Sequence, residues 1–329
     1  MTIDAQPVSN LPEGYADTAR APAIVVTGPT ATGKTRLAVA IARACHGEIL
    51  SVDSRQVYRG LDLGTGKDLE EYSEGGPAVP YHLIDVAAPG ERFDLFRFLE
   101  LARKCLVDMH RRGVTPILCG GTPLYLLALL DGYTMEGGEP DQQLRKNLAG
   151  KSTAELLQLL RQTATPELLA RTDLTQNRRI IRAIEIARTM TDQPPPPPLA
   201  NTILLAPQFT RAEVRERIAV RLDARLEAGL LDEVRSLHDH DGMSWEQLDW
   251  LGLEYRFVAR YLQGMLTYQE MHDSLLAHIR QFAKRQDGWF RKFERDGHHI
   301  HWIPRGEAES ALTLVRDFLG TVTTPTETR

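Results

Sequence analysis

The chain has 329 residues, of which 42% are hydrophobic and 25% charged, proportions that are ordinary for a globular protein of one large or two modest domains. Its formal net charge of -5 excludes a globally basic nucleic-acid-binding protein, so any contact with nucleic acid must come from local basic surfaces. No run approaches the ~18 apolar residues of a membrane helix. Three isolated cysteines form neither a disulfide framework nor a zinc motif. We therefore expect a cytoplasmic protein with no membrane partner.

Polar, turn-rich segments stand at both ends of the chain. Residues 1–22 contain no apolar stretch of signal-peptide length, and their acidic residues argue against a transit peptide. Residues 321–329 are rich in threonine. We expect both segments to be flexible tails.

The first motif follows an apolar run, Ala23–Val26, that is typical of a strand. Gly28–Thr35 then has the spacing G-x-x-x-x-G-K-[ST] of a phosphate-binding P-loop, and an apolar-periodic helix follows it. Backbone N–H groups and the helix N-terminus would face a phosphate. Lys34 would add a positive charge and Thr35 a hydroxyl ligand for Mg²⁺. A chance match in a Gly/Thr-rich turn would not explain the flanking strand and helix.

Strands and helices then alternate along the chain. Further strands are predicted at Glu48–Asp53, His82–Val86 and Thr115–Cys119, and helices at Phe93–Arg112 and from Leu124. This alternation predicts a parallel α/β sheet with right-handed crossovers. In such sheets ligands bind outside the carboxyl ends of the strands. Three groups follow predicted strand ends and should share this edge: Asp53, Asp85 and Gly120-Gly121-Thr122.

The pattern changes from about Gly137. The following stretch to Met190 is helical in pattern, and a five-proline run from Pro194 is typical of a stiff linker. A strand at Asn201–Ala206 should return to the sheet. Later helices are expected from Arg211, at Trp245–Leu262 and at Tyr268–Phe293, and a last strand at His299–Ile303. We predict an α/β core at 23–136 and 200–320, an inserted all-helical domain at 137–192, and a linker at 193–199.

Two sites in the predicted core are candidates for chemistry. A carboxylate at Asp53 is well placed to accept a proton from an attacking nucleophile, although an aspartate that caps a turn is common. Gly120-Gly121-Thr122 would let the backbone approach a ligand, or would simply form a tight turn. His82–Asp85 is an incomplete Walker B sequence. The P-loop alone therefore leaves kinase, NTPase and other transfer reactions open.

Two stretches are locally basic. Arg171–Arg182 holds four arginines and one aspartate, and Arg280–Arg295 holds six cations, two acids and interleaved aromatic residues. This pattern suits a surface that neutralises RNA phosphates and stacks bases. The residues alone slightly favour the alternative, a solvated helix face above a core aromatic stripe, because such stripes are routine.

Taken together, the motifs resemble the tRNA dimethylallyltransferase family, in order and over about Ile24 to Pro304. The matching segments are Gly28–Thr35, Asp53–Gly60, Gly64-Thr65, His82–Asp85, Gly120–Tyr125, Asn177–Glu185, Arg217-Ile218 with Gly229–Val234, and Ala283–Gln286 before Trp289–Arg291. The resemblance implies a P-loop nucleoside-triphosphate-hydrolase-like fold. It also implies transfer of a dimethylallyl group from dimethylallyl diphosphate to N6 of an adenosine 3′ to the anticodon of tRNA.

The resemblance assigns the P-loop to a diphosphate leaving group. The diphosphate-binding residues would be Gly28, Thr30, Ala31, Thr32, Gly33, Lys34 and Thr35. Lys34, Thr35 and Arg217 would neutralise the leaving group with Mg²⁺ on Thr35, and Asp53 would take the proton from N6. The tRNA-binding residues would be Ser54, Arg55, Gln56, Thr122, Arg145, Arg178, Arg179, Arg182, Lys284 and Arg285. We expect the protein to act as a monomer.

Some segments depart from the family pattern. Gly66-Lys67-Asp68 replaces the usual Ala-Lys-Pro, and Leu251–Tyr255 replaces Ile-Gly-Tyr. These changes leave open how RNA is held and whether free adenine nucleotides are accepted instead of tRNA. A kinase or ATPase, or a non-catalytic RNA-binding protein, are the alternatives from other classes. For the histidines at His298–His301 we favour structural or surface roles over a metal site.

Overall fold

The computed structural model describes residues 11–133, 140–189 and 195–323. These residues fall into two compact units, one containing Gly132–Pro197 and the other Pro12–Asp131 with Pro198–Arg329. The expected limits of the insertion, 137 and 192, lie just inside the first unit, on residues outside the described ranges. The same holds for the first two residues of the expected linker.

The larger unit is built on a six-stranded parallel sheet, as the sequence predicted. Its strand order is β3-β2-β4-β1-β5-β6, and every neighbouring pair is parallel. The strands are β1 (Ala23–Val26), β2 (Glu48–Ser51), β3 (Tyr81–His82), β4 (Pro116–Cys119), β5 (Thr202–Gln208) and β6 (Ile300–Pro304). Because β2, β4 and β1 are adjacent, the segments after their carboxyl ends meet at one edge of the sheet.

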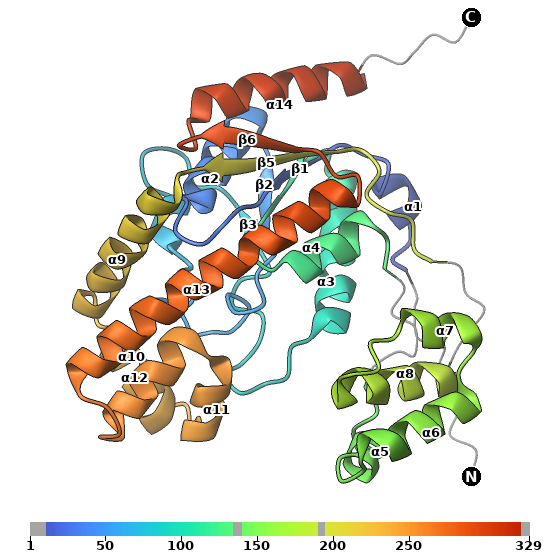
Figure 1. Ribbon diagram of the computed structural model, residues 1–329. Helices are drawn as coiled ribbons and strands as arrows, with labels where there is room; N and C mark the ends of the chain where they lie inside the picture. Colours follow the sequence, from blue (N-terminus) through green and yellow to red (C-terminus); the bar gives the residue numbers. More distant parts are fainter. Residues whose placement is uncertain (1–10, 134–139, 190–194, 324–329) are drawn as a thin grey trace, which may run out of the picture. The chain divides into compact units, whose positions relative to one another are not determined.

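Helices cover both faces of this sheet (Figure 1). The helices of this unit are α1 (Tyr15–Thr18), α2 (Lys34–Cys45), the 3₁₀ turn η1 (Leu69–Tyr72), α3 (Leu95–Arg111), α4 (Pro123–Leu130), α9 (Arg211–Glu227), α10 (Leu230–Asp239), α11 (Trp245–Leu251), α12 (Leu253–Leu262), α13 (Tyr268–Arg295) and α14 (Ala308–Thr323). None of the helices in the described part of the chain is long and apolar enough to cross a membrane.

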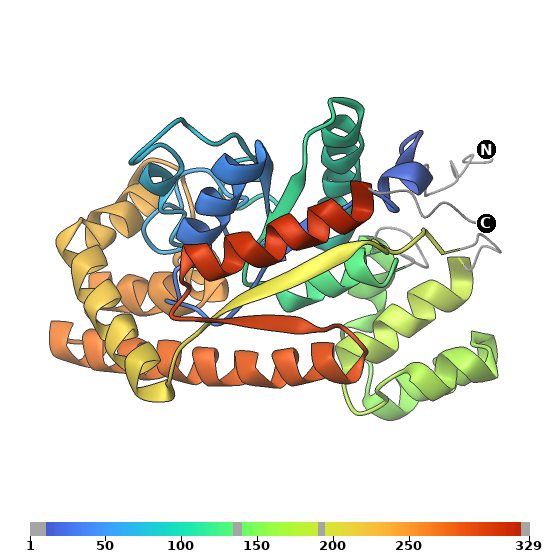
Figure 2. The same cartoon turned by 90° about the horizontal axis from the view of Figure 1, so that it is seen from above.

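The two faces of the sheet are covered by different helices. Side chains of α2 and α14 pack in one core cluster with β1, β4 and β5. Viewed from above, α14 lies on one side of β5 and β6, and α13 lies on the other (Figure 2). On the α13 side, Phe290 meets Trp302 of β6 with ring centroids 5.8 Å apart. The long helix α13 is thereby fixed against the edge strand β6.

The predicted strand at His82–Val86 is much shorter in the structure. Only Tyr81 and His82 pair with β2, and the chain then turns through Leu83 and Asp85, both with positive φ. The reason is visible in the contacts of Asp85, whose carboxylate pairs with the buried ammonium of Lys67. Asp85 still follows the carboxyl end of a strand parallel to β2, and its N–H donates to the carbonyl of Gln56 at 3.2 Å, so it lies at the predicted edge of the sheet with its carboxylate held by Lys67.

Two predicted helices are broken by glycines. The helix from Arg211 ends at Glu227, and Leu230 starts a new helix after Gly229, whose φ is 102°. The segment Trp245–Leu262 is divided at Gly252, with φ 79° and ψ -177°. Positive φ is disfavoured for residues with a Cβ, so glycine at these two positions lets the chain change direction between helices.

The described residues nearest the two chain ends form helices, although the sequence suggested flexible tails. Residues 15–18 form α1, where Tyr15 is 1% exposed and its ring lies 5.6 Å from the Arg103 guanidinium of α3. At the other end, α14 continues through Thr323. The expected tails at 1–22 and 321–329 are thus wrong for residues 12–22 and 321–323, because α1 packs on the core and α14 continues through these last residues. The other residues of both tails, apart from Leu11, lie outside the described ranges.

The smaller unit is all helical, as predicted. It contains α5 (Gln142–Leu148), α6 (Thr153–Thr163), α7 (Pro166–Arg171) and α8 (Asn177–Thr189). Leucines of α5, α6 and α7 pack against Ile180, Ala183 and Ile184 of α8 in a core of their own. This unit therefore has its own hydrophobic centre.

Candidate active site

The P-loop connects β1 to α2. Gly33 is the N-cap of α2 with φ 79°, so the first helical residues are Lys34 and Thr35. The Lys34 ammonium donates to the carbonyl of Pro29 at 2.8 Å, and the Thr32 hydroxyl donates to the same carbonyl at 2.8 Å. The loop is thereby closed around the helix N-terminus, whose free N–H groups and dipole favour an anion.

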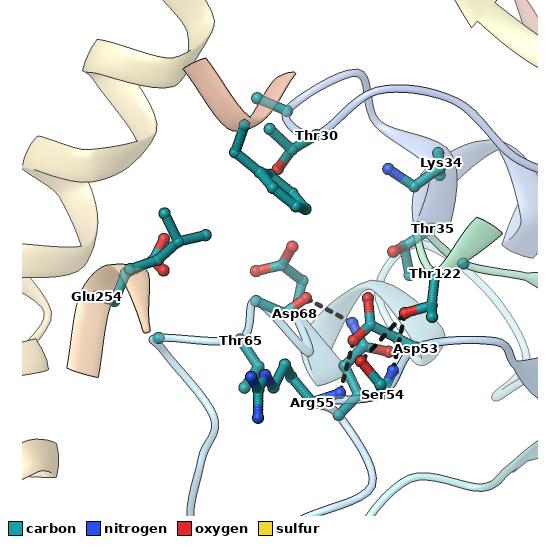
Figure 3. A pocket seen from close by; sticks show the side chains of 18 of the residues that line it. Thr30, Lys34, Thr35, Asp53, Ser54, Arg55, Thr65, Asp68, Thr122 and Glu254 are labelled. Carbon is teal, nitrogen blue, oxygen red and sulfur yellow. Dashed lines mark hydrogen bonds between the residues drawn. The ribbon is translucent and has the colours of Figure 1, made fainter. Parts of the chain in front are cut away.

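A cavity of about 440 Å³ opens beside this loop. Figure 3 shows Lys34, Thr35, Asp53 and Thr122 on one side of it and Glu254 on the other. Five of the seven predicted diphosphate-binding residues line the cavity, namely Thr30, Ala31, Gly33, Lys34 and Thr35, and the other two, Gly28 and Thr32, do not. The predicted tRNA-binding residues Ser54, Arg55, Gln56 and Thr122 also line it.

Asp53 follows the end of β2 and faces this cavity. Its Oδ1 accepts a hydrogen bond from the backbone N–H of Arg55 at 2.8 Å. Burial raises the pKa of Asp53, while that N–H and the Lys34 ammonium act in the opposite direction. Burial also lowers the pKa of Lys34 to about 8, assisted by the charge of Arg221. A carboxyl group with a raised pKa and an ammonium group with a lowered pKa thus line the same cavity.

Thr122 joins the ends of β4 and β2. Its hydroxyl oxygen accepts from the backbone N–H of Ser54 at 3.0 Å and donates to the Ser54 hydroxyl at 3.3 Å. Gln56 is held as firmly, because its amide accepts from Ser51 at 2.8 Å and donates to the carbonyl of Gly66 at 2.9 Å. Both the oxygen and the nitrogen of the Gln56 side-chain amide are therefore already hydrogen-bonded within the protein.

Two arginines of α9, one turn apart, contact the P-loop. Arg217, the predicted second cation, is exposed and does not line the cavity; it donates to the carbonyl of Ala31 at 2.7 Å and stacks over Phe209. One turn later, Arg221 lines the cavity and donates to the Thr30 hydroxyl at 2.6 Å. Sequence reasoning missed Arg221, although arginines at steps of four on one helix face were the available signal.

Gln286 of α13 is a second residue that the sequence analysis did not single out. It is 3% exposed and lines the cavity. Its amide accepts from the backbone N–H of Thr30 at 2.9 Å and donates to the carbonyl of Gly121 at 3.3 Å. It therefore bridges the P-loop and the segment after β4. Its presence in the motif Ala283–Gln286 was the only signal.

Three residues that depart from the family pattern meet at Arg225, which is 7% exposed. Its guanidinium lies 3.8 Å from the carboxylates of Asp68 and Glu254. An added Cβ at Gly66 would lie 1.9 Å from one guanidinium nitrogen, so only glycine leaves room for this arginine. All four residues line the cavity and form one part of its wall.

Two known family models match this chain. The family model described as "IPP transferase" matches residues 56–293, and the one described as "Isopentenyl transferase" matches residues 22–76. The chain belongs to the IPP transferase family.

Relatives in this family match nearly end to end. "tRNA dimethylallyltransferase 2" of Trichlorobacter lovleyi is 49% identical over 283 residues, 85% of this chain and 91% of the relative. "tRNA dimethylallyltransferase 1" of Syntrophus aciditrophicus is 45% identical over 291 residues, 87% and 95% of the two chains. These relatives confirm the resemblance that the ordered motifs indicated.

Solved structures of this family share the fold. The tRNA isopentenylpyrophosphate transferase of Bacillus halodurans is 31% identical with a TM-score of 0.65, covering 91% of this chain and 96% of that one. A eukaryotic dimethylallyltransferase acting on tRNA has a TM-score of 0.76 at 22% identity, with coverages of 94% and 81%.

The arginines predicted to bind tRNA in the helical unit of this IPP transferase contact other side chains of that unit. Arg145 and Arg182 both contact the buried carboxylate of Glu185, at 2.6 and 3.0 Å. Arg179 pairs with Asp173 at 2.6 Å. Arg178 is exposed and donates to the side chain of Gln176 at 3.1 Å. Arg145 and Arg182 thus neutralise a buried acid, whereas Arg178 lies at the surface.

Lys284 and Arg285 lie on the exposed side of α13 and make no ion pair within the described ranges. Lys284 lines a second groove of about 530 Å³ with Pro29 of the P-loop and with the basic residues Arg211, Arg215 and Arg280. A basic surface therefore adjoins the back of the P-loop.

The histidine cluster forms no recognisable metal site. His299 and His301 contact one another with ring centroids 4.5 Å apart, and His298 bonds to Asp131 at 2.8 Å. Within the described residues no group of three or more potential ligands is arranged to hold a metal ion.

Proposed function

We propose that this IPP transferase moves the dimethylallyl group of dimethylallyl diphosphate to N6 of the adenosine 3′ to the anticodon of tRNA, releasing diphosphate. The observation that carries the proposal is that Asp53 and the P-loop residue Lys34 line the same cavity. Lys34 would bind a leaving group that carries negative charge, and Asp53 would accept a proton from the attacking amine. The names of the relatives support this reading.

The departing diphosphate is neutralised by the P-loop. The N-cap of α2 at Gly33, the Lys34 side chain and Arg221 all line the cavity. As the bond between C1 and the phosphate oxygen breaks, negative charge grows on the diphosphate, and fixed donors stabilise it without reorganising. Arg217 supports this from outside, by holding the carbonyl of Ala31.

The acceptor amine reacts at the other side of the cavity. N6 of adenine forms a bond to C1 while the C1–oxygen bond breaks, and Asp53 accepts the proton that N6 loses. The hydrogen bond from the Arg55 N–H orients the carboxylate. The Thr122–Ser54 link holds the segment from which Asp53 projects.

Mg²⁺ fits the chemistry of this cavity. Hard oxygen donors are the ligands that Mg²⁺ prefers, and it keeps substrate phosphates and water among its ligands. The cavity offers the Thr35 hydroxyl together with carboxylates at Asp53 and Asp68. When bound on Thr35, Mg²⁺ would offset charge on the diphosphate.

The acceptor adenine must leave its stack to reach this buried centre. Ser54, Arg55 and Thr122 would contact the extruded nucleotide, and Gln56 would act through the loop that it fixes. Arg178, Lys284 and Arg285 are the exposed candidates for RNA phosphates, since Arg145, Arg179 and Arg182 have acidic partners. We further propose that the enzyme is a cytoplasmic monomer.

Product analysis tests the function. The protein is incubated with dimethylallyl diphosphate, Mg²⁺ and unmodified tRNA, and the RNA is digested to nucleosides for mass spectrometry. We expect N6-dimethylallyladenosine, and its absence from every tRNA with adenosine 3′ to the anticodon would overturn the proposal. Parallel reactions with AMP and ADP test the free-nucleotide alternative. ATP consumption without any allylic diphosphate would indicate a kinase or ATPase.

A further inference from the structure

An unusually exposed tryptophan stands on α11. Trp250 is 67% exposed, more than any other large hydrophobic side chain within the described residues. Tryptophan is mostly buried in folded proteins, because its indole removes a large apolar area from water. Its exposure here is not explained by packing within the larger unit.

Trp250 is placed at the rim of the catalytic cavity. The Arg55 guanidinium carbon lies 5.0 Å from the centroid of its ring, which is a cation–π distance. Arg55 itself lines the cavity, two residues after Asp53, and Leu251 and Gly252 line it immediately after Trp250. The guanidinium therefore packs over the indole ring, and the two groups form an aromatic and partly cationic surface next to the place where chemistry occurs.

Such a surface matches a nucleobase. Aromatic rings and arginine planes stack on unpaired bases, and each base stacked on an aromatic residue contributes substantially to single-strand binding. When the target adenine leaves its stack, each neighbouring base loses one stacking partner. Other exposed apolar side chains, Met265 and Tyr268, lie at the turn between α12 and α13 and do not line the cavity.

We propose that Trp250, with Arg55 packed against it, is the stacking platform for a nucleobase adjoining the target adenosine. The proposal rests on the proposed function, since it takes an RNA acceptor for granted. It assigns to Trp250 a role in binding and positioning RNA, separate from the proton transfer at Asp53. It also gives Arg55 two neighbours, the reacting adenine and the flanking base.

The test couples the tryptophan to the base. Anticodon stem-loops are made with an intact loop, or with an abasic nucleotide on the 5′ or the 3′ side of the target adenosine. Their dissociation constants are measured by fluorescence anisotropy, without dimethylallyl diphosphate, for the wild type and for Trp250→Ala. We expect Trp250→Ala to weaken binding of the intact loop about tenfold, as loss of one stacked base should. One of the abasic loops should bind the wild type equally weakly, and Trp250→Ala should lose nothing further with it.

Two further variants separate stacking from bulk. Trp250→Phe keeps an aromatic face and should remain within about threefold of the wild type, whereas Trp250→Leu keeps apolar bulk only and should resemble Trp250→Ala. Met265→Ala, at a comparably exposed position, should bind like the wild type.

The outcomes distinguish the two proposals. If each abasic loop weakens wild type and Trp250→Ala by the same factor, no base stacks on Trp250 and the platform is overturned. Coupling in the binding assay upholds the platform even if no prenylated product forms, in which case the proposed function alone fails.

Discussion

Burial acts against the charge of both reactive side chains. It raises the pKa of Asp53 and lowers that of Lys34 to about 8, so each group gives up its charge more readily than in water. That is the condition of a group that must accept a proton or respond to a passing charge. Asp53 follows β2 and Lys34 follows the loop after β1, and the burial of both side chains at these places shifts their pKa values.

Replacing Asp53 by Asn separates proton transfer from binding. The amide keeps the size of the side chain and the bond to the Arg55 N–H but cannot accept the N6 proton. We expect kcat to fall by about 100-fold or more, as loss of a general base does, with little change in affinity for dimethylallyl diphosphate. Single-turnover kinetics with tRNA and calorimetric titration of the diphosphate substrate measure the two effects. An equal loss of diphosphate affinity would instead make Asp53 a ligand or structural residue.

The lowered pKa of Lys34 predicts how affinity depends on pH. The ammonium is charged below about pH 8 and attracts the diphosphate, and it becomes neutral as pH rises through that value. Affinity for dimethylallyl diphosphate should therefore fall by about tenfold between pH 7 and pH 9, following the charged fraction of one group. Calorimetric titration across this range checks the slope.

Lys34→Gln provides the control for that titration. It should bind the diphosphate weakly at every pH and show a flat profile over the same range. A wild-type affinity that is constant from pH 7 to pH 9, or a slope that persists in Lys34→Gln, would assign the titration elsewhere.

At the scale of elements, loops rather than strands determine the shape of the cavity. Glu233 of α10 accepts hydrogen bonds from the backbone N–H groups of Asp62, Leu63 and Gly64, at 3.0, 2.6 and 3.0 Å, and from the Tyr255 hydroxyl at 2.9 Å. One carboxylate thus fastens the segment before Gly66 to both α10 and α12. Such charge-assisted bonds are the stronger class of protein hydrogen bond.

How much of this could be read from the sequence follows from the range of each interaction. The P-loop, the strand-end position of Asp53 and the parallel sheet depend on local patterns and strand adjacency, and they were predicted. The convergence of Gly66, Asp68 and Glu254 on Arg225 joins segments more than 150 residues apart, and no local pattern encodes it. Arg217 was predicted and Arg221 was not, because motif matching gives the order of residues but not which of two arginines one turn apart on α9 reaches the cavity.

A double-mutant cycle tests whether Gly66 makes room for Arg225 in the cavity wall. Gly66→Ala places a Cβ 1.9 Å from the Arg225 guanidinium, at a residue whose φ is 64°. We expect the free energy of unfolding to fall by about 2–4 kcal/mol, from overpacking and from left-handed backbone strain. In the Arg225→Met background the same substitution should cost less by about 1–3 kcal/mol, because only the backbone strain remains. Urea unfolding of the four proteins measures this, and additive costs would show that the glycine does not make room for the arginine.

At the scale of the whole molecule, the net charge of -5 does not distinguish basic residues that pair with an acid from those that face solvent. In the helical unit, Arg145 and Arg182 neutralise Glu185, so they stabilise that unit whatever it binds. On α13, Lys284 and Arg285 have no acidic partner within the described ranges and face solvent. An acidic protein can therefore present a local basic surface for RNA without being basic overall.

The salt dependence of RNA binding distinguishes these two kinds of cation. Each Lys or Arg that neutralises a phosphate releases a counterion, so removing one should reduce the slope of log Kd against log salt by about 1. We expect this for Lys284→Ala and for Arg285→Ala with an anticodon stem-loop. Arg145→Ala should instead leave Glu185 buried with fewer partners and lower thermal stability, because a buried charge that loses a partner is costly.

Arg316→Ala is the matched control for that experiment. Arg316 is an exposed cation on α14, which covers the opposite face of the sheet from α13 (Figure 2). Its loss should change neither the slope nor the affinity. If Lys284→Ala and Arg316→Ala have the same slope as the wild type while Arg145→Ala reduces it, RNA is held by the helical unit and not by α13. A shallow slope in the wild type itself would favour a free nucleotide as acceptor, because few phosphates would then be neutralised.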